Sequence, residues 1–198
     1  MISSRKRHSL AFLTAFLMAG AVHAEPNGDR AVLERLSGTY ASPTIENWYG
    51  AYGKREFTFE KGSWSLRFHL ALDPELKKPV FEFRTGGPYK IGSQSAAVPN
   101  AYEAVFHETA KYVTLLTNDP GLIQGFGLAG CGLQLKVEAD ISAGGCANWK
   151  PVAECGEDHD LLAIDNVGAL YFGVRPKDNN MCTADKRPKA LLGPVVRR

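Results

Sequence analysis

The sequence predicts an all-β fold, a single antiparallel β-barrel of about eight or nine strands preceded by a short helix. Apolar and polar residues alternate with period two along most of the chain, which is the pattern of half-buried strands. Turn-forming residues separate these segments at short intervals, as in Gly86-Gly87-Pro88 and Asp119-Pro120-Gly121. We prefer a barrel to a sandwich because closure of the sheet leaves no exposed edge.

The expected elements follow in chain order. A short helix is expected at 29–36, where Ala31, Val32, Leu33 and Leu36 recur at helical spacing. The clearest strand is 64–70, in which Trp64, Leu66, Phe68 and Leu70 face one way and Ser65, Arg67 and His69 the other. The same pattern predicts strands at 55–60, 80–84, 102–107, 112–116, 133–139, 161–164 and 169–174.

The first 24 residues predict a cleavable secretory signal peptide. A basic stretch that contains Arg5 precedes the apolar run 10–20, which is shorter than the about 20 residues that a membrane-spanning helix needs. Small residues at Val22 and Ala24 favour cleavage before Glu25. We therefore expect residues 25–198 to form one periplasmic or secreted domain with no membrane span.

Removal of the signal peptide changes the charge of the chain. The full sequence has 23 basic and 21 acidic residues, and the signal peptide holds three of the basic ones and none of the acidic ones. The mature chain keeps 20 basic and 21 acidic residues, a formal net charge of −1. Without a basic block it lacks the electrostatic pattern of nucleic-acid-binding proteins, so we expect no nucleic-acid partner.

The cysteines favour disulfide bonds. Four cysteines in an exported chain indicate two disulfides with three possible connectivities, of which we expect the sequential one, Cys131 with Cys146 and Cys155 with Cys182. A zinc site is the alternative, but the sequence has no Cys-x-x-Cys pair and no histidine at ligand spacing.

Three short segments contain residue types found in reactive or cofactor sites. Residues 125–130 match the dinucleotide pattern Gly-x-Gly-x-x-Gly, but no helix is expected after them, so a turn or bulge is the better interpretation. The acidic cluster at 154–160, which contains Glu154, Glu157, Asp158, His159 and Asp160, is interpreted as a solvated turn, with a calcium or zinc site as the alternative. His107-Glu108 is interpreted as the end of a strand.

No catalytic residues are therefore assigned, and we expect neither a cofactor nor a metal. A hydrolase or metal-dependent enzyme that uses the acidic cluster stays as a less favoured hypothesis, because a pair of acid and base carboxylates can be assembled in space.

Aromatic residues carry the functional expectation. By alternation, a set of large rings projects to the inside of the predicted barrel: Phe57, Phe59, Trp64, Phe68, Phe81, Phe83, Phe106 and Phe172. They either fill a dry core or line a cavity, since about eight strands enclose a space near the size that holds a small ligand. We name the first seven as candidate ligand-binding residues, for an acyl chain, a lipid or a similar apolar molecule.

The chain resembles the APCDD family, the domain of adenomatosis polyposis coli down-regulated protein. The likeness covers most of residues 33–195, in motifs that are short and that follow the family's order. They are Leu36-Ser37-Gly38-Thr39-Tyr40-Ala41-Ser42, the aromatic strand pair around Phe57 and Trp64, Gly87-Pro88-Tyr89-Lys90-Ile91, Ala101-Tyr102-Glu103-Ala104-Val105-Phe106, Cys131-Gly132, Leu170-Tyr171-Phe172-Gly173, Cys182 and Arg187-Pro188.

The resemblance implies a lipocalin-like barrel with an apolar cavity that suits a lipid or acyl chain. Animal members are secreted or membrane-tethered antagonists of Wnt signalling. This chain differs from them in having one such domain, no transmembrane tail, and Ile45 before Glu46 in place of an early cysteine. We therefore expect a stand-alone exported barrel. An interaction or envelope-structural protein, with a dry core and a protein partner bound through its loops, is the alternative.

Overall fold

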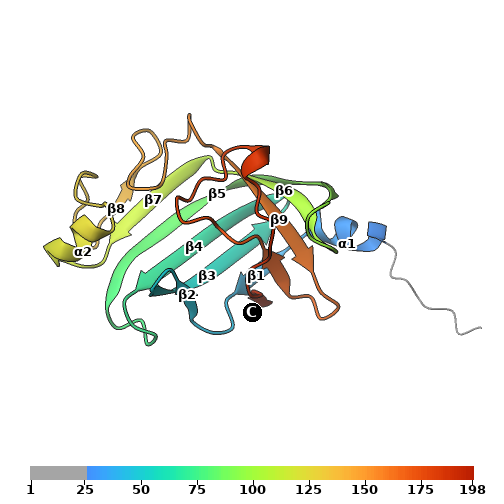
Figure 1. Cartoon of the computed structure of the whole chain (residues 1–198), viewed down its shortest axis with the longest axis horizontal. Helices are drawn as coiled ribbons and strands as arrows, with labels where there is room; N and C mark the ends of the chain where they lie inside the picture. The colour runs from blue at the N-terminus through green and yellow to red at the C-terminus, as the bar shows by residue number, and fades with distance from the viewer. Residues whose placement is uncertain (1–25) are drawn as a thin grey trace, which may run out of the picture.

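The structure, a computed structural model, describes residues 26–198 and is built almost entirely from antiparallel strands (Figure 1). The predicted signal peptide at 1–24 lies outside the described residues. Within the described part, none of the helices is long and apolar enough to cross a membrane.

Eight strands follow one another around a sheet that is nearly closed into a barrel, which confirms the predicted fold class. Their order is β10-β9-β6-β5-β4-β3-β1-β11. The sheet closes where Leu170 and Val195 exchange two backbone hydrogen bonds of 2.9 and 2.8 Å, next to the pairing of β11 with β1. The bounds are β1 Gly38–Ala41, β3 Ala51–Glu60, β4 Ser63–Ala71, β5 Pro79–Gln94, β6 Tyr102–His107, β9 Glu157–Ile164, β10 Leu170–Phe172 and β11 Val196–Arg197.

Strand β5 belongs to two sheet regions because it changes partner near its middle. Its first half pairs with β7, Ala110–Leu115, up to Gly86 opposite Ala110, and its second half pairs with β6, from Tyr89 opposite Phe106. Strand β7 extends the sheet beyond the barrel. The further short elements are β2 Glu46–Trp48, α2 Pro120–Gly125, β8 Glu138–Asp140 and the 3-10 helix η1 Ala184–Lys186.

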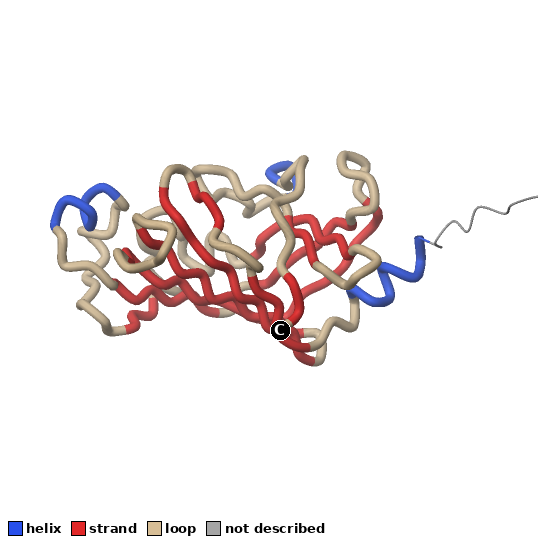
Figure 2. The backbone as a smooth tube through the Cα atoms, turned by 90° about the horizontal axis from the view of Figure 1, so that it is seen from below, coloured by secondary structure: helices blue, strands red, loops and turns tan. Residues whose placement is uncertain are grey.

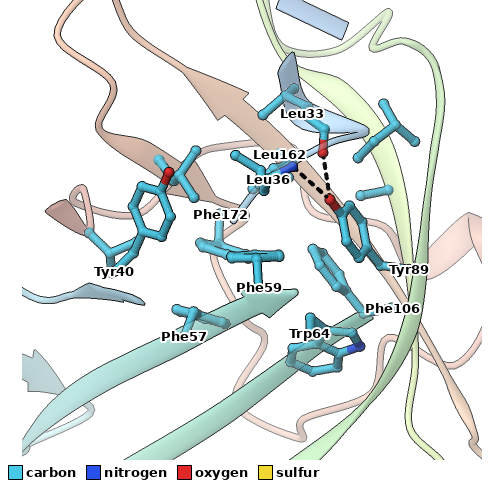
Figure 3. Packing of buried hydrophobic residues seen from close by; sticks show 14 of the residues in the cluster. Leu33, Leu36, Tyr40, Phe57, Phe59, Trp64, Tyr89, Phe106, Leu162 and Phe172 are labelled. Atoms are coloured by element: carbon cyan, nitrogen blue, oxygen red, sulfur yellow. Dashed lines mark hydrogen bonds between the residues drawn. The ribbon is translucent and has the colours of Figure 1, made fainter. Parts of the chain in front are cut away.

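The N-terminal helix α1, Pro26–Leu33, was predicted at 29–36 and begins and ends earlier. Its last turn is held by a tyrosine of the barrel. The Tyr89 hydroxyl donates to the Leu33 carbonyl at 2.8 Å and accepts from the Leu36 backbone N–H at 3.2 Å (Figure 3). Leu36 therefore gives its N–H to the barrel rather than to a further helical turn. Leu33 and Leu36 are buried in the core at this end of the barrel.

The strand predicted at 133–139 is wrong over most of its length. Only β8 forms there, and Leu135 and Val137, expected to face inward, are 44% and 51% exposed. Positive φ angles of 65° at Gly132 and 60° at Lys136 turn the backbone away from the extended conformation. The alternating apolar pattern of this segment therefore belongs to a loop.

Two apolar cores occupy the two ends of the molecule. The first core lies beside α1 and contains Leu33, Leu36, Tyr40, Phe57, Phe59, Trp64, Tyr89, Phe106, Leu162 and Phe172 (Figure 3). The second core lies beside α2 and contains Leu70, Val80, Phe81, Phe83, Val113, Leu115, Leu128 and Ile141. Helices α1 and α2 lie at opposite ends of the molecule (Figures 1 and 2). Between them, Leu66 and Phe68 of β4 are only partly buried, because they line the cavities described next.

Candidate ligand-binding site

Two adjoining cavities lie in the region between the cores. The inner cavity has a volume of about 70 Å³ and the outer cavity about 330 Å³. Both are lined by the same group of residues where they meet, which consists of Trp48, Phe68, Trp149, Arg175 and Asn179. The outer volume falls in the range that small-molecule sites in proteins occupy, about 300–1,000 Å³.

Aromatic rings in mutual contact form the walls. Phe57 stacks on Phe172 with ring centroids 4.0 Å apart, and Trp64 meets Phe106 edge to face at 4.8 Å. At the boundary between the cavities, Trp149 stacks on Phe83 at 4.8 Å, and Trp48 contacts Phe68 at 4.9 Å. These paired rings give the site a rigid apolar surface, with little rotamer entropy left to lose when a ligand binds.

Six of the seven candidate ligand-binding residues line a cavity. Phe57, Trp64, Phe83 and Phe106 line the inner one, Phe81 lines the outer one, and Phe68 lines both. Phe59 lines neither. It is 1% exposed and packs in the first core against Tyr40 and Tyr89, with centroids 6.0 and 5.3 Å apart (Figure 3).

Charged side chains also face the inner cavity. They are Arg55, Glu108, Asp158, Asp160 and Arg175. Two of them correct the interpretation of 154–160 as a solvated turn, because Asp158 and Asp160 are only 3% and 5% exposed. Strand β9 begins at Glu157 and pairs with β6, which places Asp158 opposite Phe106 and Asp160 opposite Ala104 on the inner face.

Most of these charges are paired. The Arg175 guanidinium donates to the Asp158 carboxylate and, at 2.8 Å, to the side-chain oxygen of Asn179. Lys111 Nζ lies 2.8 Å from the Glu108 carboxylate and also donates to the backbone carbonyl of Cys155 at 2.7 Å. Burial raises the pKa of Glu108, and the charge of Asp158 adds to this effect, while Lys111 opposes it.

Asp160 is held by backbone groups. Its Oδ1 accepts hydrogen bonds from the backbone N–H groups of Leu161 at 2.7 Å and Gly173 at 2.9 Å. Burial raises the pKa of the Asp160 carboxyl to about 7, although Arg175 and these hydrogen bonds act in the opposite direction. At neutral pH this carboxyl group can therefore both donate and accept a hydrogen bond.

The two disulfides hold the loops that complete the cavity walls, and they confirm the predicted sequential pairing. Cys131 is bonded to Cys146 and Cys155 to Cys182. Cys146 exchanges two backbone hydrogen bonds of 2.8 Å with Trp149, so the first disulfide fixes the loop that carries this ring. The second disulfide ties the segment after Arg175 to the start of β9.

Trp48, Arg55, Trp149 and Arg175 line the site but were not predicted as site residues. Alternation could have indicated Arg55, because it lies two residues before the inward-facing Phe57 on β3. The same spacing from Leu162 places Asp160 and Asp158 inside. Trp149 and Arg175 lie on loops that only the disulfides and the closed barrel bring to the cavity, so no local pattern marks them.

The remaining candidate segments have structural roles. Helix α2 ends at Gly125, and the rest of the segment 125–130 is turn structure, as expected. His107 is the last residue of β6, as expected, and Glu108 after it is buried. Within 26–198, no group of three or more His, Cys, Asp or Glu side chains has an arrangement that could hold a metal ion.

Comparisons with known proteins found no protein-family model and no curated protein that matches this chain.

Proposed function

We propose that this protein is an exported β-barrel that binds an acyl chain, a lipid or a similar apolar small molecule. The observation that carries the proposal is the outer cavity of about 330 Å³, which leads past Trp48, Phe68 and Trp149 into the barrel. A concave space of this size, lined by aromatic rings, is typical of small-molecule sites in proteins.

Two further points support the proposal. The two disulfides fit an oxidising compartment, and with the predicted signal peptide they favour a periplasmic or secreted location. The resemblance to the APCDD family implies the same kind of ligand.

The proposal is tested first on protein isolated after export. Native mass spectrometry under gentle conditions should find a bound apolar molecule, and organic extraction should release it. Titration of the stripped protein with medium-chain fatty acid esters should then shift the intrinsic fluorescence, because all three tryptophans of the chain, Trp48, Trp64 and Trp149, line the cavities.

A variant that fills the outer cavity locates the binding site. Ala147 lies on an exposed loop at the rim of this cavity, and we expect Ala147→Phe to weaken ester binding by about tenfold or more. The matched control is Ala129→Phe, on another exposed loop that lines neither cavity. A protein that emerges empty and does not respond to any apolar probe contradicts the proposal, and it favours an interaction protein that uses its loops.

A further inference from the structure

Arg55 is a buried arginine in an unusual position, inside the barrel on the same face of β3 as Phe57 and Phe59. Its side chain is 4% exposed. Nε and Nη2 donate to the Glu46 carboxylate at 2.9 and 2.6 Å, and Nη2 also donates to the Gly193 carbonyl at 2.8 Å. Glu46 is held in turn by the Trp48 indole N–H at 3.0 Å. The guanidinium is therefore fixed in place by several contacts.

One donor of this fixed guanidinium is left over. Among the described residues, Arg55 Nη1 is the buried side-chain nitrogen or oxygen that has no hydrogen-bond partner. A buried donor without a partner lowers stability because it has lost its water and gained nothing in return. Arg55 lines the inner cavity, so a group that enters this cavity lies beside its guanidinium.

The charges around the inner cavity indicate what kind of acceptor fits. Arg55 is neutralised by Glu46, Arg175 by Asp158, and Lys111 by Glu108. The carboxyl group left over is Asp160, which lines the same cavity. An ionised ligand head would add a negative charge beside these carboxyl groups, while both arginines that line the cavity already face a carboxylate, and burial of an unbalanced charge is costly.

We propose that Arg55 Nη1 binds an uncharged hydrogen-bond acceptor, the carbonyl oxygen of an ester or amide, at the buried end of a ligand whose apolar body fills the outer cavity. This inference rests on the proposed function and adds the chemical class of the ligand head. The rings at the boundary, Trp48, Phe68 and Trp149, then surround the apolar chain next to that head.

The test compares four probes with the same chain: methyl decanoate, decane, decanoate and decylamine. Binding to the stripped mature protein is measured by tryptophan fluorescence and calorimetry at mildly alkaline pH, where decanoate is ionised. We expect methyl decanoate to bind about tenfold more tightly than decane, the effect of one hydrogen bond from a charged donor, and more tightly than either charged probe.

The variant Arg55→Met with Glu46→Gln removes the donor and its partner together, so that no buried carboxylate is left unpaired. It should lose the preference for the ester and keep its affinity for decane. Arg84 and Glu138 make a similar two-contact pair on the surface, at 2.9 and 2.8 Å, and Arg84→Met with Glu138→Gln is the matched control that should change nothing.

Two single variants keep the test valid if the double variant does not fold. Arg55→Lys keeps the positive charge but lacks the Nη1 donor, so it should lose the ester preference, whereas Glu46→Gln leaves Nη1 in place and should keep it. Equal binding of ester and decane by the unaltered protein, or an ester preference that survives loss of Nη1, overturns the inference while leaving apolar binding intact. Tighter binding of decanoate or decylamine overturns it as well. Failure of all four probes overturns the proposed function, and the inference with it.

Discussion

At the scale of single residues, Asp160 shows how burial beside aromatic rings changes the pKa of a carboxyl group. The backbone N–H groups of Leu161 and Gly173 satisfy one oxygen, yet burial still raises the pKa of Asp160 from 3.8 to about 7. Between these two values the folded protein holds a proton that the unfolded chain has released. Folding stability therefore falls as the pH rises through this range.

Replacement of Asp160 by Asn tests this reasoning. Asn keeps the oxygen that accepts both backbone hydrogen bonds but does not ionise. We expect Asp160→Asn to have nearly unchanged stability near pH 4 and to be more stable than the unaltered protein near pH 8, by at most roughly 4 kcal/mol. Urea unfolding at the two pH values measures the difference.

Asp165 provides a control of opposite sign. Backbone hydrogen bonds, chiefly from Ala169, lower the pKa of this half-buried carboxyl group, so its ionised form is favoured in the folded protein. Asp165→Asn should therefore be less stable than the unaltered protein at neutral pH, with the difference disappearing in acid. Parallel pH profiles for Asp160→Asn and the unaltered protein would contradict the assignment.

At the scale of elements, strand β5 joins the barrel to its extension. It does so around Gly86 and Gly87, a segment called the bend below, where its partner changes from β7 to β6. At Gly86 and Gly87 the strand passes so close to its neighbours that there is no room for side chains. A Cβ atom on Gly87 would lie 2.3 Å from the His107 carbonyl oxygen, which also accepts the Trp64 indole N–H at 3.2 Å. The bend thus sets the spacing between β5 and the end of β6 and helps to position Trp64.

We expect Gly87→Ala to destabilise the fold by roughly 1–3 kcal/mol, because the backbone of β6 or β5 must move to admit the methyl group. Thermal or urea unfolding measures this loss. Gly130→Ala is the matched control, since a Cβ atom there meets no atom within 4 Å. Equal stability of the two variants would show that the bend tolerates a side chain.

Period-two alternation located each long strand, because each has one face in the core and one face toward solvent. It was wrong about the extent of β5, which was predicted at 80–84 and runs from Pro79 to Gln94, so the predicted turn at Gly86-Gly87-Pro88 lies inside the strand. It failed at 133–139, where Gly132 and Lys136 adopt positive φ angles that the apolar pattern does not reveal. It also left β1 and β11 unpredicted, since strands of 4 and 2 residues are too short to show a period. The rings of the site were accessible to the same reasoning, whereas loop residues such as Trp149 were not.

At the scale of the whole molecule, two disulfides fasten long loops to the barrel. The Cys131–Cys146 bond spans 15 residues and the Cys155–Cys182 bond 27. Replacement of either pair by alanine should lower stability by about 3 kcal/mol in the chain-entropy model, slightly more for the longer loop. Urea unfolding measures this loss. Dithiothreitol should lower the stability of the unaltered protein, which has two disulfides to reduce, by more than it lowers the stability of either variant, which has one. Unchanged midpoints in both variants would show that the loops are held by packing alone.

The pairing of the last strand, β11, with the first, β1, has a consequence for the order of events during synthesis. A ribosome produces β1 early, but its partner at Val196–Arg197 only after all other strands, and the Leu170 contact to Val195 forms equally late. Contacts between segments so far apart in sequence form slowly, because the intervening chain must first be ordered. The barrel therefore closes only after this last region has been synthesised, and until then β1 has only one of its two strand partners, β3.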